Sequence, residues 1–175
     1  SLSVTATGIG GSTTIPLTPG GSLTADELVR YPQLGGYTIL QLPADTQLST
    51  LQTALEGQLA FSAVGSNGSL QYATGVQTAG VLDDLYYYPG KLGVVFHHGE
   101  TDWQDWQDDE NCFIKLKLWA PTAQSVSLQI FDHEADTTPS VIVPMHQHNG
   151  VWVADGEPDW KGKYYLYSVK TVSYT

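Results

Sequence analysis

The chain has 175 residues, 41% of them apolar, with 18 Gly and 9 Pro, a composition typical of a folded, turn-rich protein. Seven basic residues against 18 acidic ones give a net charge of −11, which disfavours nucleic acid and anionic membrane surfaces as partners because both carry negative charge. One cysteine rules out an internal disulfide, and no apolar run approaches the ~20 residues of a membrane-spanning helix.

The first half predicts a small β-rich domain with one full helix, over residues 1–90. Alternating apolar residues predict one or two weak strands within residues 1–23, where the domain is expected to be incomplete at its start. Thr24 and Glu27 fit a capping box that begins a short helix, which Pro32 ends almost at once.

The full helix is predicted between Thr46 and Gly57, with Asp45 or Thr46 as its cap. Asn67-Gly68 predicts a tight turn that joins two strands into a hairpin. A short connector follows, with a domain boundary near residue 90. The strands predicted in this half are 37–42, 58–64 and 70–74.

Beyond residue 90 every segment predicts β structure. Short strands about ten residues apart, separated by Pro, Gly, Asn and Asp, are typical of an immunoglobulin-like β-sandwich. We therefore predict a mainly β chain whose sandwich occupies residues 91–175. The expected strands are 92–96, 113–119, 126–131, 141–145, 151–154 and 164–172.

No arrangement of side chains makes a persuasive catalytic site. Asp83 and Asp84 are adjacent, and on an extended chain they point apart, so they cannot jointly flank a glycosidic bond across the ~5–10 Å that its hydrolysis requires. The sequence has no Gly-x-Ser-x-Gly elbow, phosphate loop or dinucleotide fingerprint. We predict no catalytic residue in this chain.

Two patterns invite a metal site. Residues 100–110 are rich in acids but lack the Asp-x-Asp-x-Asp-Gly spacing of a calcium loop, so a solvated loop is the preferred interpretation. His146 and His148 would point to one side of a strand, a two-ligand spacing for zinc that has no third ligand. We expect no metal and no cofactor here, and leave calcium open for a longer parent protein.

Five Trp and ten Tyr make aromatic rings the main candidates for ligand contact. Trp160 precedes the last strand, where a loop would present its ring beside hydrogen-bonding groups, an arrangement that suits sugar stacking. Trp103 and Trp106 lie three residues apart and share a face if their loop turns helically. Plain packing is the alternative for Trp160, and docking on a neighbouring domain for the pair.

Two further tryptophans are candidates for interdomain packing. Trp152 stands between Val151 and Val153, so we predict that it lies opposite core-facing valines and is exposed or interfacial. Trp119 and Pro121 form a Trp-Ala-Pro turn between two strands, where the ring could hold sugar, pack a core or face another domain.

The order of several segments resembles the family 48 carbohydrate-binding module of pullulanases and limit dextrinases, which are debranching enzymes of glycoside hydrolase family 13. Further segments upstream resemble the domain that precedes this module in the limit-dextrinase type, so the resemblance covers about residues 28–175. The module segments are Leu92–Phe96, Leu118–Gln124, Val126–Phe131, Asn149–Trp152 and Gly162–Tyr167; the upstream ones are Tyr31–Tyr37, Gln58–Leu59, Ala73–Gln77 and Gly80–Leu85.

The resemblance implies a longer parent enzyme that hydrolyses α-1,6 branches in pullulan, glycogen or starch dextrins. Its catalytic carboxylates would belong to a downstream (β/α)₈ barrel, a fold of about 250 residues. The absence of an initiator Met and of signal-peptide features agrees with a piece of such a protein. Of the secreted and plastidial locations considered for the parent, we favour secretion.

One departure bears on sugar binding. Glycogen-binding relatives of the module place a Trp shortly after the second strand and a Lys inside the last one, whereas the matching regions here read Phe131–Glu134 and Tyr165–Tyr167. We therefore expect a noncatalytic support for the barrel, with α-glucan as a candidate ligand. The alternative is a purely structural module that packs between domains, in which Trp119, Pro121 and Trp152 make the contact.

Overall fold

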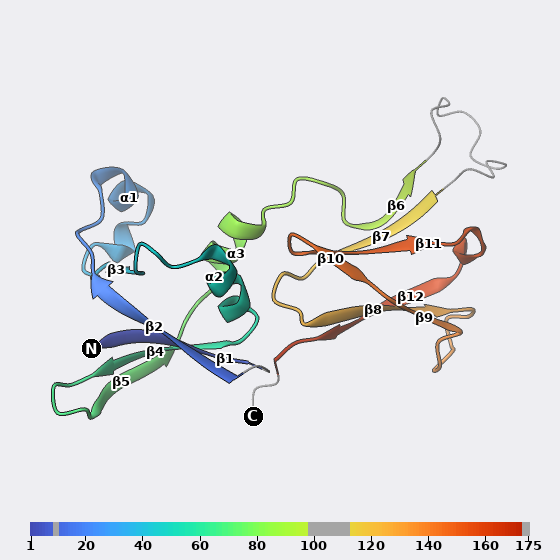
Figure 1. Ribbon diagram of the computed structural model, residues 1–175. Helices are drawn as coiled ribbons and strands as arrows, with labels where there is room; N and C mark the ends of the chain where they lie inside the picture. Colours follow the sequence, from blue (N-terminus) through green and yellow to red (C-terminus); the bar gives the residue numbers. More distant parts are fainter. Residues whose placement is uncertain (9–10, 98–112, 173–175) are drawn as a thin grey trace. The chain divides into compact units, whose positions relative to one another are not determined.

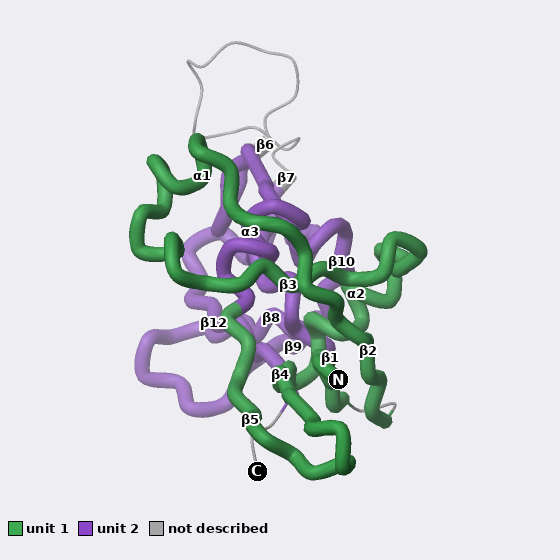
Figure 2. The backbone as a smooth tube through the Cα atoms, turned by 90° about the vertical axis from the view of Figure 1, so that its left-hand side faces the viewer, with its two compact units in different colours: residues 1–77, 174 green, residues 78–173, 175 purple. Residues whose placement is uncertain are grey.

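The structure, a computed structural model, describes residues 1–8, 11–97 and 113–172 (Figure 1). It divides between Gln77 and Thr78 into two compact units, unit 1 before this point and unit 2 after it (Figure 2). The boundary predicted from the sequence lies near residue 90, and the difference is α3 (Ala79–Tyr86), which groups with unit 2. Among the described residues, no helix has the length and apolar character needed to cross a membrane.

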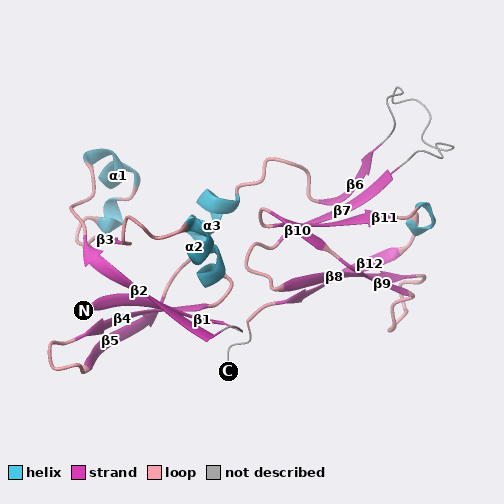
Figure 3. Ribbon diagram, viewed as in Figure 1, coloured by secondary structure: helices cyan, strands magenta, loops and turns pink. Residues whose placement is uncertain are grey.

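Both units consist mainly of antiparallel strands with a few short helices, which confirms the mainly β prediction (Figure 3). Unit 1 holds a five-stranded sheet in the order β3-β2-β1-β4-β5. Its strands are β1 (Leu2–Gly8), β2 (Gly11–Pro19), β3 (Leu40–Gln41), β4 (Gln58–Val64) and β5 (Leu70–Gly75); its helices are α1 (Ala25–Arg30), η1 (Pro32–Leu34) and α2 (Leu48–Leu55).

The sheet of unit 1 has an apolar face and a hydroxyl-rich face because its strands alternate between the two residue types. Val4 pairs with Ile15 on one neighbouring strand and with Phe61 on the other, so these three side chains lie in one apolar row. Ile15 is buried. On the opposite face the hydroxyls of Ser3 and Ser62 lie 3.1 Å apart.

The capping box predicted at Thr24 is confirmed. Its Oγ1 accepts a hydrogen bond from the Glu27 amide at 3.3 Å, while its own amide donates to Glu27 Oε2 at 2.8 Å. The Thr24 amide and the Thr24 hydroxyl both donate to Glu27 Oε2, and these two bonds hold the pKa of the Glu27 carboxyl below its usual value. Helix α2 follows Gln47, whose side chain makes no capping bond, rather than the predicted Asp45 or Thr46.

The predicted hairpin turn at Asn67-Gly68 is also confirmed, since it joins β4 to β5. Gly68 has φ +78°, a left-handed conformation that glycine adopts without a Cβ clash. The Ser69 amide and hydroxyl donate to Asn67 Oδ1 at 3.1 and 2.6 Å. The turn chemistry therefore accounts for this Asn-Gly-Ser sequence.

Unit 2 contains α3 and, after it, the predicted β-sandwich. One sheet has the order β10-β11-β7-β6 and the other β12-β8-β9. The strands are β6 (Gly93–His97), β7 (Phe113–Trp119), β8 (Ser125–Phe131), β9 (Val141–Pro144), β10 (His146–His148), β11 (Val151–Gly156) and β12 (Tyr164–Lys170), with η2 (Pro158–Trp160) before β12.

The core of unit 2 lies between the two sheets. Leu128 and Ile130 project into it from β8, and Leu116 and Ala154 from the facing sheet. Leu116 pairs directly with Ala154, so both point to the same side. Alternate residues of each strand therefore fill the space between the layers, as the strand periodicity requires.

Tyr167 reaches this core from β12 and links the two sheets, because its hydroxyl donates to the Lys117 carbonyl at 3.4 Å. Its ring meets Tyr165 edge to face at 5.5 Å between centroids, since alternate residues of β12 share a face. Burial, and to a lesser extent Tyr165, raises the pKa of Tyr167 to about 12.

This shift predicts a loss of stability in alkali. The unfolded state releases the Tyr167 proton near the ordinary tyrosine pKa of 10.0, before the folded state does near about 12. The stability that protonated Tyr167 contributes is therefore fully present below about pH 10 and is lost as the pH rises towards 12. Urea unfolding of wild type and Tyr167→Phe across this range should show a steeper decline for wild type. Equal slopes would contradict the assignment.

Candidate functional site

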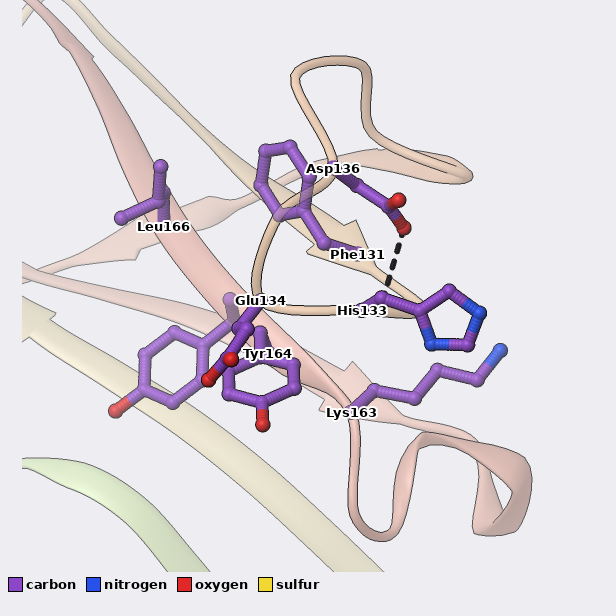
Figure 4. Close-up of a pocket in the computed structure, with 8 residues that line it drawn as sticks. Phe131, His133, Glu134, Asp136, Lys163, Tyr164 and Leu166 are labelled. Carbon is purple, nitrogen blue, oxygen red and sulfur yellow. Dashed lines mark hydrogen bonds between the residues drawn. The ribbon is translucent and has the colours of Figure 1, made fainter.

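The candidate site is a hollow of about 370 Å³ in unit 2. It combines apolar and aromatic side chains with charged and hydrogen-bonding ones, and Figure 4 shows how these converge. The lining residues are Phe131, His133, Glu134, Asp136, Lys163, Tyr164, Tyr165 and Leu166. The lining comes from two places in the sequence, the end of β8 with the loop after it, and the start of β12.

Strand pairing brings these two places together. Phe131, the last residue of β8, is paired with Tyr164, the first residue of β12. Directly paired residues place their side chains on the same face, so both rings belong to the outer face of this sheet. Phe131 is buried and Tyr164 is half-exposed, so one ring is covered while the other remains accessible to a ligand.

The loop beyond β8 is held in shape by its own hydrogen bonds. The His133 amide donates to Asp136 Oδ2 at 2.8 Å (Figure 4), and the Asp136 amide donates back to the His133 carbonyl at 3.2 Å. At the end of the loop the Ser140 amide and hydroxyl both donate to the Ile130 carbonyl, at 2.8 and 3.2 Å. This bonding fixes the loop that carries Glu134 beside the hollow.

Lys163 organises the charge at the edge of the hollow. Its Nζ lies 3.0 Å from Asp132 Oδ1 and 4.0 Å from Asp159 Oδ2. The hydrogen bond from Lys163 lowers the pKa of the exposed Asp132 carboxyl. Such exposed pairs contribute little stability, so their main effect is to fix where the ammonium group lies.

The arrangement suits a small uncharged polyhydroxylated ligand. Aromatic and aliphatic side chains offer surface to an apolar ring face, while the carboxylates of Glu134 and Asp136 accept hydrogen bonds and Lys163 donates them. Among the described residues lining the hollow there is no Ser, Thr or Cys. The described part of the chain also shows no group of three His, Cys, Asp or Glu placed to hold a metal.

Comparison with known proteins finds a separate match for each half of the chain. Residues 1–84 match the family described as Pullulanase N2 domain, and residues 104–173 match Carbohydrate-binding module 48 (Isoamylase N-terminal domain). Each half of the chain is thus similar to one of these two families. The resemblance to the N-terminal region of pullulanases is therefore confirmed, and the candidate hollow lies within the residues that match module 48.

Similar proteins are pullulanases much longer than this chain. Pullulanase 1, chloroplastic, of Arabidopsis thaliana is 37% identical over 149 residues, which are 85% of this chain and 14% of that protein. Klebsiella pneumoniae pullulanase is 29% identical over 81% of this chain and 12% of that protein. A crystal structure of Klebsiella pneumoniae pullulanase complexed with maltotriose matches 97% of this chain and 16% of its own, with a TM-score of 0.74 and 28% identity.

Within module 48, Trp160 lies on η2 and packs against the core, half-buried. A Cβ added at Gly156 would come within 3.1 Å of its ring, so this glycine leaves room for the indole. Trp160 does not line the hollow. These contacts favour packing, the alternative weighed for this residue, while its stacking on sugar stays a prediction.

The Trp119-Ala120-Pro121 turn packs against the end of α3. Trp119 Nε1 donates to the Tyr86 carbonyl at 2.8 Å, and Pro121 is buried. Beside them, Lys117 Nζ donates to the Tyr88 hydroxyl at 3.0 Å. The turn thus binds the segment before β6 to its own unit, and packing of Trp119 and Pro121 against a further domain stays a prediction.

The predicted exposure of Trp152 is wrong. The side chain is 8% exposed and belongs to the core cluster, and its Nε1 donates to the Ala120 carbonyl at 2.9 Å. It pairs with Leu118 and points inward, so Val151 and Val153 take the outer face. Val151 is nevertheless buried on that outer face, so both sides of β11 carry a buried apolar residue. Trp152 is therefore a core residue rather than an exposed surface for another domain.

Four other predicted residues, His146, His148, Asp83 and Asp84, do not line the hollow. Trp103, Trp106 and the acidic stretch 100–110 fall outside the described residues. His146 and His148 are exposed on β10. Asp83 and Asp84 lie on α3 rather than on an extended chain, which corrects the geometry assumed for them.

Most residues of the hollow were not singled out from the sequence. The signal in the sequence was indirect: the resemblance implies that Phe131–Glu134 and Tyr165–Tyr167 match the regions where glycogen-binding relatives place a Trp and a Lys. Lys163, Tyr164 and Asp136 had no such signal.

Proposed function

We propose that this chain is the noncatalytic N-terminal region of a pullulanase-type debranching enzyme, a parent that hydrolyses α-1,6-glucosidic bonds. The two family matches and the similarity to pullulanases support this proposal. The chain corresponds to 14% and 12% of these relatives, and the reaction is assigned to a separate catalytic barrel that this region supports. The partners are that barrel and an α-glucan such as pullulan, starch or a glycogen dextrin.

We further propose that α-glucan contacts the chain at the hollow beside β8 and β12. The observation that carries this is the convergence of Phe131, Tyr164 and Tyr165 with hydrogen-bonding side chains around about 370 Å³. Because the family's Trp and Lys are replaced here, the half-exposed ring of Tyr164 is the group that would contact the pyranose face. Sugar sites need an accessible aromatic plane beside polar groups, and Tyr164 meets both conditions.

Replacing Tyr164 by Ala tests this site. Wild type should bind maltose in a calorimetric titration, and the variant should bind about tenfold more weakly because the stacked ring contributes on the order of 1–1.5 kcal/mol. Tyr87→Ala, which removes an exposed ring outside the hollow, is the matched control and should bind as wild type does. Neither variant nor wild type should release reducing sugar from pullulan. Absence of maltose binding by wild type would remove the glucan proposal.

A purely structural, interdomain-packing role is the second candidate, and α1 favours it. This helix has no buried residue, and Val29 is 84% exposed, close in sequence to the exposed Tyr31. Exposed apolar side chains of this kind mark a surface that another protein surface covers. The same titration separates the two candidates, since a structural module would show no heat with maltose.

A further inference from the structure

Asn-Gly occurs twice in the chain, each time in the turn of a β-hairpin. Asn67-Gly68 joins β4 to β5, and Asn149-Gly150 joins β10 to β11. Asparagine is among the thermolabile residues of proteins, and a following glycine exposes its backbone nitrogen to the asparagine side chain because glycine has no Cβ. The two turns therefore place one reactive dipeptide in two settings of the same chain.

The side-chain oxygen of Asn67 accepts two hydrogen bonds. The Ser69 amide and hydroxyl donate to Oδ1 at 3.1 and 2.6 Å. The direction of the hydroxyl is fixed, because Gln71 Nε2 can only donate and lies 2.8 Å from Ser69 Oγ. Two donors on one carbonyl oxygen draw electron density from Asn67 Cγ and stabilise negative charge on Oδ1, as an oxyanion hole does.

The Gly68 nitrogen is accessible as the attacking group. Asn67, Gly68 and Ser69 are all exposed, and a Cβ added at Gly68 would meet no atom within 4 Å. The Gly68 amide donates to the Gly65 carbonyl at 3.1 Å, which keeps the nitrogen inside the turn. Opening this one bond at an exposed hairpin turn costs little, so water can take the amide proton.

We propose that Asn67 is a self-modification site, which the hairpin turn converts to aspartate and isoaspartate through a cyclic imide. The Gly68 nitrogen gives its proton to water and bonds to Asn67 Cγ, while the Ser69 donors stabilise the charge that develops on Oδ1. The Cγ–Nδ2 bond then breaks, and Nδ2 takes a proton from water and leaves as ammonia. One water molecule adds to either carbonyl of the imide and opens the ring. The net change replaces the amide by a carboxylate.

The product differs from the original turn in charge and in length. It adds one negative charge to a chain whose net charge is already −11. In the isoaspartate form the backbone runs through Cγ and gains one carbon atom. The turn is closed by the Gly65 amide, which donates to the Ser69 carbonyl at 2.9 Å, so this lengthening loosens the hairpin.

Asn149-Gly150 is the same dipeptide in a closed setting. Gly150 is buried, and a Cβ added to it would lie 2.8 Å from Tyr86 Cδ1. Its carbonyl accepts a hydrogen bond from the Ala120 amide at 3.0 Å. The residue two places after Asn149 is Val151, which has no hydroxyl to donate to the asparagine oxygen. Ring closure at Asn149 therefore requires local opening of the turn.

Peptide mass spectrometry of the whole chain, kept folded in a mildly alkaline buffer, measures the conversion of each asparagine separately. Asn67 should convert at least about tenfold faster than Asn149, because the closed turn reacts only from its opened population. Ser69→Ala should slow conversion of Asn67 about tenfold, the factor for losing one hydrogen bond to a developing charge. Ser66→Ala is the matched control, since it removes another exposed hydroxyl of the same turn and should leave the rate unchanged.

The same measurement in urea separates the fold from the sequence. The unfolded chain neither holds the Ser69 hydroxyl on Oδ1 nor buries Gly150, so both asparagines should convert at similar rates and Ser69→Ala should have little effect. Equal rates in the folded chain, or conversion of Asn67 only in urea, would overturn the proposal. Equal rates for Ser69→Ala and Ser66→Ala, with circular dichroism showing both folded, would remove the role of the Ser69 hydroxyl.

Discussion

Replacing Trp152 by Ala should lower the free energy of unfolding of unit 2 by about 3–5 kcal/mol, the range for removing a large aromatic from a core. Trp152 lies in the cluster with Leu116, Leu128 and Ala154, and its indole occupies space that the rigid strands around it cannot close. The substitution also deletes the donor that satisfies the Ala120 carbonyl. We therefore expect this to be the most damaging single change among those considered.

Urea unfolding followed by near-ultraviolet circular dichroism measures this effect. Trp152→Phe provides the control, because it keeps most of the apolar volume and loses the hydrogen bond to Ala120, at a cost of about 1–2 kcal/mol. A loss for Trp152→Ala no greater than that for Trp152→Phe would contradict the core position. It would then support the exposed position that the valine pattern indicates.

Gly150→Ala should destabilise unit 2 by about 2–4 kcal/mol, because a side chain there meets both backbone strain and steric conflict. Gly150 has φ +81° and follows Asn149, at φ 46°, in the two-residue turn between β10 and β11. An added Cβ would stand 2.8 Å from Tyr86 Cδ1 and 3.0 Å from Pro121 Cβ. Either the turn or the end of α3 would have to move.

Gly162→Ala separates the two causes. Gly162 has nearly the same φ, +80°, but its added Cβ would meet no atom within 4 Å. Gly162→Ala should therefore lower the free energy of unfolding only by the cost of the left-handed conformation, about 1–2 kcal/mol. Thermal unfolding of both variants gives the comparison, and equal losses would show that Tyr86 and Pro121 do not crowd Gly150.

The strands of unit 2 could be predicted from the sequence because alternation is strong and turn residues separate them. The sequence could not show which side of β11 faces the core, because apolar residues occupy both sides of this strand. Val151 is covered on the outside and Trp152 on the inside, so periodicity alone favoured the wrong parity. The sequence was interpreted as a short connector before residue 90, whereas Ala79–Tyr86 form helix α3.

The candidate hollow depends on register, which the sequence does not reveal. Phe131 and Tyr164 are far apart in the chain, and only the pairing of β8 with β12 sets them side by side. Its place in a loop before the last strand favoured Trp160, whose ring packs on the core instead of lining the hollow.

The bonds that Tyr86 and Tyr88 make with Trp119 and Lys117 bear on where the sandwich begins as an independent folding unit. The matched module starts at residue 104, but the acceptor for the Trp119 indole lies upstream, on the backbone of α3. A sandwich excised at residue 91 would lose Tyr86, which accepts the bond from Trp119 and packs beside Gly150. It would also lose Tyr88, the partner of Lys117. The physical limits of the module are therefore wider than its sequence signature, and Thr78 is the natural point at which to cut.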